Sequence, residues 1–337
     1  MLEHGAMTSD KGKMESYVKQ AILRAAIKAF DFVAAPAVYV SAVVLKLVRR
    51  GGVERMPISK SILLNVGVFP IRDHYYEPLF DGRRLERPLS DVRSLPGIDW
   101  NVEGQLALLD QFHFAEELLR LPTEKPSERT YYYNNTAFGS GDGEFLYSLV
   151  RLKKPRRIVE IGSGFSTLAA IEALKANKAD DASYSCEHIC VEPYEMPWLE
   201  TTPVKVVRKR VETCDPVIFS SLEHDDILFI DSSHMIRPQG DVLFEYLELL
   251  PKLRRGVIVH VHDIFSPRDY PAGWVIDEVR FWNEQYLLES FLCHNSDWKI
   301  IGAVNYLHRT HFERLSAKCP MLRRDKNPGS FYIQRIR

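Results

Sequence analysis

From about residue 140 onward, short apolar runs alternate with segments of helical periodicity. The runs are rich in β-branched side chains and bounded by turn residues, namely RIVEIG (157–162), ICVEP (189–193), VKVVRK (204–209), DILFID (226–231) and VIVHVHD (257–263). Runs of this kind are typical of parallel strands buried on both faces of a sheet. The helical patterns between several of them, such as 166–176 and 241–250, indicate a doubly wound α/β domain. Two more strands are predicted at 298–307 and 330–336, with a helical segment around 312–317 between them.

The first 130 residues have a different pattern. Residues 32–45, FVAAPAVYVSAVVL, are apolar apart from Ser41 and have basic residues on both sides. This stretch is shorter than the roughly 20 residues that a spanning helix needs and contains Pro36, so a simple membrane span is not the preferred interpretation. Three interpretations stay open: an amphipathic helix in the membrane interface, a helix packed on the protein or a partner, and a span or re-entrant hairpin.

These patterns divide the chain into three parts. We assign residues 1–50 to a polar tail and a basic, apolar helix, of which residues 14–50 are the part that could contact a membrane surface. Residues 51–130 are interpreted as a cap or lid, because a segment rich in Pro, Gly and Arg precedes an amphipathic helix at 102–121. Residues 131–337 form the α/β domain.

The composition narrows the class of protein. The chain has 337 residues, with 44 Lys and Arg against 45 Asp and Glu, so no global charge attracts nucleic acid. The 5 cysteines are an odd number, which suits free thiols in a reducing compartment. The spacing of Cys186 and Cys190 resembles a metal clip, but no second clip follows, and we expect both to be small buried side chains. The polar first 20 residues do not have the pattern of a signal peptide. We expect a cytoplasmic protein, peripheral on the inner face of the membrane if residues 14–50 meet lipid.

Ligands of doubly wound sheets bind outside the carboxyl ends of the strands. The first predicted strand ends in Glu160, and a turn and helix start follow it, with Gly162, Ser163, Gly164, Ser166 and Thr167. Thr167 stands where a dinucleotide fingerprint needs Gly or Ala, and an acid before the glycines does not favour a pyrophosphate. Glu160 suits a cationic or amine-bearing ligand instead. Glu192, at the end of the second strand, can accept the two hydroxyls of a ribose.

The fourth and fifth strands end in a second group of polar residues. Asp231 and His234 follow the fourth strand, and His262 and Asp263 follow the fifth. His260 lies one pleat deeper on the same face as His262, so we expect a hydrogen-bonded core histidine there. The other four could bind a divalent cation, act as a general base with an orienting Asp, or form a purely structural cluster.

Taken together and in order, VEIGSGFSTLAA, VEP, DILFIDSSH and GVIVHVHDIF resemble class I S-adenosylmethionine-dependent methyltransferases. Within that class they are similar to the bacterial branch related to catechol- and caffeoyl-CoA-type O-methyltransferases. The resemblance covers about residues 130–337. It implies a Rossmann-like, mostly parallel sheet of seven strands, with helices on both faces and an antiparallel last strand.

The resemblance also implies roles for the residues at the strand ends. The cofactor-binding residues would be Glu160, Gly162, Ser163, Gly164, Ser166, Glu192 and Asp231, with Glu192 on the ribose. Metal-dependent relatives hold Mg with an Asp after strand four and an Asp-Asn pair after strand five. Asp231 and Asp263 match the two aspartates, but Ile264 stands at the position of the Asn. The third ligand would therefore have to be His262 or His234.

We therefore predict a methyltransferase that uses S-adenosylmethionine, with Mg or another divalent cation as a possible second cofactor. The acceptor would be a hydroxyl on a sugar or small metabolite, and His234, His262 and Asp263 would be the catalytic residues. Two alternatives stay open: an NAD(P)-dependent oxidoreductase or epimerase on a Rossmann sheet, and a non-catalytic binding protein docked at a membrane.

Overall fold

The computed structural model describes residues 4–127 and 129–337, with side chains from Val18 onward within that range. The chain divides into two compact units, with the boundary between Leu85 and Glu86. The predicted boundaries at residues 50 and 130 differ from this division. The reason is that the helical segment after residue 101 contributes Leu109, Phe112 and Leu118 to the core of the second unit. A role as cap or lid for residues 51–130 stays a prediction.

The second unit is built on one seven-stranded sheet with the order β3-β2-β1-β4-β5-β7-β6. Its strands are β1 (Arg157–Ile161), β2 (Glu187–Val191), β3 (Lys205–Val207), β4 (Ile227–Ile230), β5 (Ile258–Val261), β6 (Trp298–Ala303) and β7 (Phe331–Arg335). The strands from β3 to β5 pair in parallel, and β7 runs antiparallel to both β5 and β6. This confirms the predicted fold class, including the antiparallel last strand.

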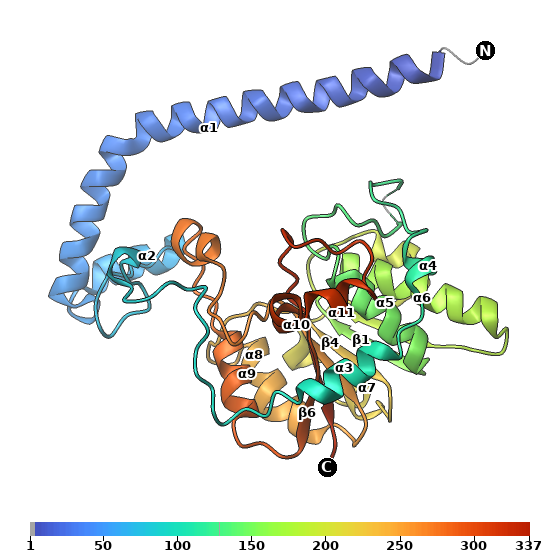
Figure 1. The fold of residues 1–337 in the computed structure, drawn as a ribbon. Helices are drawn as coiled ribbons and strands as arrows, with labels where there is room; N and C mark the ends of the chain where they lie inside the picture. The colour runs from blue at the N-terminus through green and yellow to red at the C-terminus, as the bar shows by residue number, and fades with distance from the viewer. Residues whose placement is uncertain (1–3, 128) are drawn as a thin grey trace. The chain divides into compact units, whose positions relative to one another are not determined.

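Helices cover both faces of this sheet (Figure 1). One face carries α3 (Val102–Asp110), α4 (Ala115–Leu118), α5 (Asp142–Lys153), α6 (Phe165–Asp180), α10 (Val304–Thr310) and α11 (Phe312–Ser316). The other carries α7 (Val217–Ser220), α8 (Asp241–Phe244) with the π and 3-10 turns that continue it to Lys252, and α9 (Glu284–Leu292). Strand alternation explains the two cores: Ile158 faces the first set of helices, whereas Val159 and Ile161 face the second.

One predicted helix is broken. Residues 102–121 were expected to form a single helix, but α3 ends at Asp110 and α4 begins at Ala115. Phe112 lies in the turn between them, where its ring is 1% exposed and meets the ring of Phe145 edge-on at 5.1 Å. Burial of this aromatic side chain takes precedence over continued helical periodicity.

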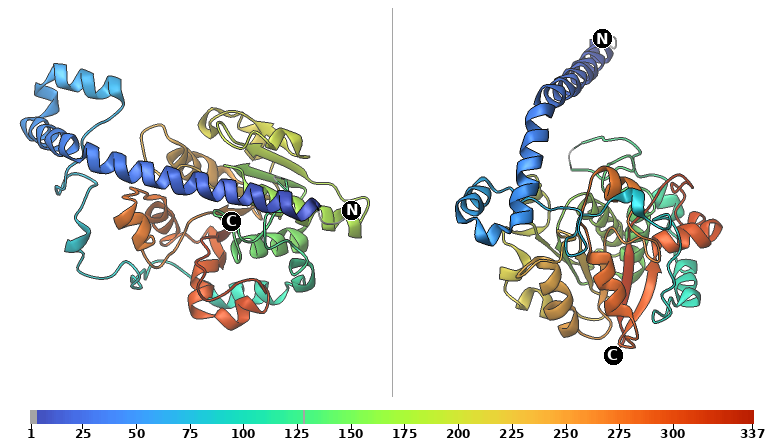
Figure 2. Two further views of the ribbon diagram at one scale, coloured as in Figure 1. Left: turned by 90° about the horizontal axis from the view of Figure 1, so that it is seen from above. Right: turned by 90° about the vertical axis from the view of Figure 1, so that its left-hand side faces the viewer.

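The first unit contains α1 (His4–Gly51), a 3-10 turn (Val53–Arg55), α2 (Pro57–Val66) and a second 3-10 turn (Gly82–Arg84). Figure 2 shows α1 as one continuous helix from two further directions. The helix includes Pro36 and extends well beyond the apolar stretch at 32–45. Its part Val18–Gly51 is long and apolar enough to cross a membrane, a test that signal sequences near an N-terminus also pass. Residues 1–3 of the predicted polar tail lie outside the described residues, as do the side chains of residues 14–17 in the predicted membrane-contact segment.

Candidate active site

The turn after β1 is tied to the end of β4. Gly162 has φ of +75°, and a Cβ at this position would lie 1.9 Å from the carbonyl oxygen of Asp231. Only glycine fits here, because a side chain would be strained and would clash with backbone. The hydroxyl of Thr167 donates to Glu160 Oε2 and accepts from the Gly164 N–H at 3.1 Å. Thr167, which replaces the fingerprint glycine, therefore fastens the turn to the strand.

A cavity of about 530 Å³ opens beside this turn at the carboxyl ends of β1, β2 and β4. It brings together three of the predicted cofactor-binding residues, Gly162, Glu192 and Asp231. Its charged lining residues are Glu192, Glu195, Arg210, Glu212, Asp231, Arg237 and Asp241. The carboxylates outnumber the guanidinium groups, which favours a ligand that carries positive charge.

Glu192 is held in a fixed orientation at the rim of this cavity. One of its carboxylate oxygens accepts the backbone N–H groups of Tyr194 and Glu195, both at 2.9 Å, and the other faces the N–H of Ser163 at 3.4 Å. Ser163, Gly164 and Ser166 do not line the cavity. Glu160 does not line it either, because its side chain is fully buried on the α6 side of the sheet. Direct cofactor contacts for these four residues stay predictions.

His234 is enclosed by carboxylates at the end of β4. Its Nδ1 lies 2.8 Å from Glu284 Oε2, while its Nε2 lies 3.2 Å from Asp231 Oδ1 and 3.7 Å from Asp263 Oδ2. Burial alone would lower the pKa of His234, but the hydrogen bonds to Asp231 and Glu284 outweigh it and raise that pKa well above its ordinary value. The ring of Trp282 covers the imidazole, with ring centroids 4.2 Å apart.

His262 and Asp263 lie beside His234, as the strand ends predict. His262 Nε2 is 3.6 Å from Asp263 Oδ1, and burial raises the pKa of Asp263. Asp263 and His234 both have left-handed backbone, with φ of +56° and +57°. Asp142, on α5, accepts the N–H groups of Gly329 at 3.0 Å and Ser330 at 2.8 Å and so fixes the segment next to Asp263.

His260 is a core residue, as predicted. It is fully buried and stacks on Phe229, with ring centroids 4.0 Å apart. Burial lowers the pKa of His260 well below its ordinary value, so the ring is neutral. The expected hydrogen bond is not present, because neither ring nitrogen has a hydrogen-bond partner among the described residues.

Part of the chain matches a known protein family. Residues 159–264, from β1 to the residue after Asp263, match the family described as "Methyltransferase domain". A protein of Archaeoglobus fulgidus described as uncharacterized is 31% identical over 174 residues, which are 48% of this chain and 76% of that protein. The segment from β1 to Ile264 is therefore a methyltransferase domain. The resemblance to S-adenosylmethionine-dependent methyltransferases and the prediction of an enzyme are thereby confirmed.

Two solved O-methyltransferase structures are also similar to this chain. An O-methyltransferase from Bacillus cereus in complex with SAH is 16% identical, with a TM-score of 0.37 and coverage of 71% of this chain and 98% of that chain. The O-methyltransferase TomG from Streptomyces achromogenes, in complex with SAM, is also 16% identical, with a TM-score of 0.35 and coverage of 69% and 90%.

The sequence did not point to Glu284. This residue begins α9 and is fully buried, and its second carboxylate oxygen accepts the hydroxyl of Tyr246 at 3.1 Å. Residues at strand ends can be identified from the sequence, whereas a carboxylate at the start of a helix beyond the next strand has no such signal. In the methyltransferase, Glu284 fixes the ring orientation of His234.

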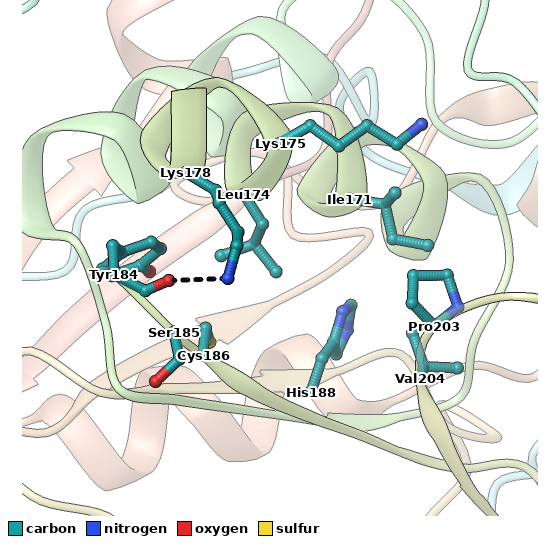
Figure 3. Close-up of a pocket in the computed structure, with 10 residues that line it drawn as sticks. All are labelled: Ile171, Leu174, Lys175, Lys178, Tyr184, Ser185, Cys186, His188, Pro203 and Val204. Atoms are coloured by element: carbon teal, nitrogen blue, oxygen red, sulfur yellow. Dashed lines mark hydrogen bonds between the residues drawn. The ribbon is translucent and has the colours of Figure 1, made fainter. Parts of the chain in front are cut away.

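A second polar cluster lies on the α6 side of β1 and β2. His188 Nε2 is 3.3 Å from Glu160 Oε1, and Cys190 is fully buried next to both. Figure 3 shows His188 below α6, in a pocket of about 240 Å³ that Leu174 and Lys178 cover from the helix. Burial would lower the pKa of His188, but Cys190 and Glu160 outweigh it and raise that pKa to about 10.

Proposed function

We propose that this methyltransferase transfers the methyl group of S-adenosylmethionine to a hydroxyl oxygen of a small-molecule or saccharide acceptor. The observation that carries the proposal is the arrangement of His234 between Glu284 on one ring nitrogen and Asp231 and Asp263 on the other. A hydroxyl becomes a competent nucleophile when a positioned base removes its proton, and an imidazole oriented by a carboxylate is suited to that task.

The acidic cavity is the proposed cofactor site. Glu192 lies where a strand-end carboxylate can accept ribose hydroxyls. Asp231 supplies negative charge at the carboxyl end of β4. S-adenosylmethionine carries a positive sulfonium and an ammonium group, which match the excess of carboxylates in the lining. Gly162 allows the backbone to turn beside the bound molecule without a side chain in the way.

The proton of the acceptor hydroxyl passes to a histidine in this proposal. The carboxylates around His234 raise its pKa, so the imidazole keeps its proton while no positive charge is bound beside them. A positive charge bound next to Asp231 lowers that pKa by repulsion. The imidazole then loses its proton, and Nε2 can accept the proton of the acceptor hydroxyl. His262 is the second candidate for the base, since its Nε2 faces Asp263 from the other side. Glu284 orients the imidazole of His234, and Asp263 lies beside that of His262. The acceptor oxygen attacks the methyl carbon in line with the carbon–sulfur bond, which breaks as the neutral thioether leaves.

The same residues fit a divalent cation. One ligand atom from each of Asp231, His234 and Asp263 lies within 4.8 Å of the others, an oxygen-rich set that suits Mg or Mn and, with the imidazole, also Zn or Fe. Ile264 offers no ligand, because its apolar side chain is 1% exposed within the core. Such a cation would act as a Lewis acid on the acceptor hydroxyl. Binding of Mn²⁺ to the chelator-treated protein, measured by electron paramagnetic resonance, distinguishes this form of the proposal from the metal-free one.

Calorimetry with S-adenosylmethionine tests the cofactor site. The folded full chain is expected to bind it, and replacement of Glu192 by Gln is expected to weaken binding about 10- to 100-fold, the range for loss of charged hydrogen bonds. Glu187→Gln is the matched control, because Glu187 lies at the opposite end of the same strand and is exposed. Absence of binding to the folded wild-type chain would refute the proposal.

A further inference from the structure

The first unit contains a basic cavity that the methyltransferase site does not use. Its volume is about 710 Å³, and it lies between the last turns of α1 and the segment that follows α2. Its lining residues with a fixed charge are Lys46, Arg49, Arg50, Arg72, Asp73 and Arg84. Five of these carry a fixed positive charge and one carries a negative charge, so the cavity favours an anion.

Two guanidinium groups of this cavity are oriented in advance. Glu77, whose side chain is 7% exposed, pairs with Arg49 at 3.2 Å and with Arg72 at 2.8 Å. Arg49 also lies over the ring of Phe69, 5.3 Å from its centroid. Fixed guanidinium groups bind phosphate with little further loss of side-chain freedom, because their donors match its oxygens in pairs.

Two positive charges of the cavity, those of Lys46 and Arg50, are uncompensated, whereas Arg84 pairs with Asp73 at 2.9 Å. No ion pair or hydrogen bond is recorded for the side chains of Lys46 and Arg50 among the residues that the structure describes. Lys46 and Arg50 are both exposed, so their charge is available to a ligand that enters the cavity.

The cavity lies at one end of a large apolar surface. On α1, side chains such as Phe32, Val33 and Tyr39 are 84%, 77% and 72% exposed. Leu45 is both part of this apolar helix and part of the cavity lining. Beyond α2, Tyr75 and Tyr76 are 93% and 85% exposed. Apolar surface bordered by tyrosines and basic residues is the pattern of a segment that meets the lipid–water boundary.

We propose that this cavity binds the phosphate of an anionic phospholipid head group, while the apolar surface of α1 lies in the lipid. The juxtaposition of Leu45 with Lys46, Arg49 and Arg50 places the change from apolar to basic at the cavity itself, as the acyl–head-group boundary requires. Arg49 and Arg72 provide paired donors for the phosphate oxygens, and Lys46 and Arg50 provide the net charge. This inference does not depend on the acceptor or on the methyl transfer.

Vesicle flotation of the full chain tests the proposal. We expect binding to vesicles of phosphatidylcholine with phosphatidylglycerol to be stronger than binding to phosphatidylcholine alone. The double substitution Lys46→Gln with Arg50→Gln should weaken binding to the anionic vesicles about 25-fold, since each basic residue at a membrane surface contributes about fivefold. The double substitution Arg55→Gln with Lys60→Gln removes the same charge from the same unit outside the cavity and should change binding less than threefold.

Three results would overturn the proposal. Equal binding of the wild-type chain to neutral and anionic vesicles would exclude recognition of the head-group charge. Equal losses in the two double variants, with unchanged thermal unfolding in both, would exclude the cavity as the site. Binding of inorganic phosphate by calorimetry at micromolar concentration, together with no preference for anionic vesicles, would assign the cavity to a soluble phosphate compound instead.

Discussion

Both ring nitrogens of His234 face carboxylates, and Glu284 is the one that faces Nδ1. The protonation of His234 therefore depends in part on Glu284. The carboxylate lies 2.8 Å from Nδ1 and is one of the groups that raise the pKa of His234. Replacement of Glu284 by Gln removes a negative charge and should lower that pKa. Titration of the imidazole by nuclear magnetic resonance measures the change, with Glu223→Gln as a control at an exposed acid. An unchanged titration in the Glu284 variant would show that the carboxylate does not control the proton on His234.

The His188 cluster predicts how stability depends on pH. The pKa of His188 is raised from an ordinary value of 6.5 to about 10 in the folded chain. Its contribution to stability is therefore complete below pH 6.5 and is lost as the pH rises towards 10, at about 1.4 kcal/mol for each pH unit. Denaturant unfolding between pH 6 and 10 should show this loss, and His188→Gln should flatten the profile. If the free energy of unfolding of the His188→Gln variant depended on pH as steeply as that of the wild type, another group would be responsible for the pH dependence.

Candidate site residues at the ends of strands could be predicted from the sequence, whereas those contributed by helices could not. Asp231, His234, His262 and Asp263 come together because parallel strands end at one edge of the sheet. Glu284 could not be found in this way. Glu160 stands at a strand end too, but side-chain alternation turns it below α6 and away from the cavity.

At the scale of elements, the turn between β1 and α6 is set by one glycine. Gly162→Ala should lower the melting temperature by several degrees and abolish cofactor binding, because its Cβ would meet the Asp231 carbonyl at 1.9 Å. Gly273→Ala is the control: the nearest atom to its Cβ would be Asp277 Oδ2 at 3.7 Å, an ordinary contact. Scanning calorimetry and titration with S-adenosylmethionine measure both effects. Similar losses in the two variants would contradict this account of the turn.

The strands could be predicted from the sequence more accurately than the helices. All seven strands could be read from short apolar runs, since strands buried on both faces need such residues throughout. The helix expected at 102–121 is interrupted because a tertiary contact of Phe112 overrides the local pattern. The helix α1 begins at His4, so residues that the sequence assigned to a polar tail are helical as well.

For the whole molecule, the division into two units predicts that cofactor binding and membrane binding can be separated. Both apolar core clusters and every candidate site residue lie in Glu86–Arg337. A chain that begins at Glu86 is therefore expected to bind S-adenosylmethionine with the affinity of the full chain, within about twofold, and to stay in the soluble fraction when mixed with anionic vesicles. Calorimetry and flotation measure the two properties separately. Loss of cofactor binding in a folded truncated chain would show that the first unit contributes to the site.

The position of β7 has a consequence for the order in which the protein is made. This strand is the last of the seven along the chain, yet it pairs with β5 on one side and β6 on the other. During synthesis β5 and β6 are both complete before residues 331–335 have left the ribosome, so β5 waits with one unpaired edge and β6 without a partner strand. The segment at 329–330 that Asp142 fixes beside Asp263 arrives at the same late moment. The parallel strands β1 to β5 and the acidic cavity at their carboxyl ends can thus form before Asp142 gains these two partners.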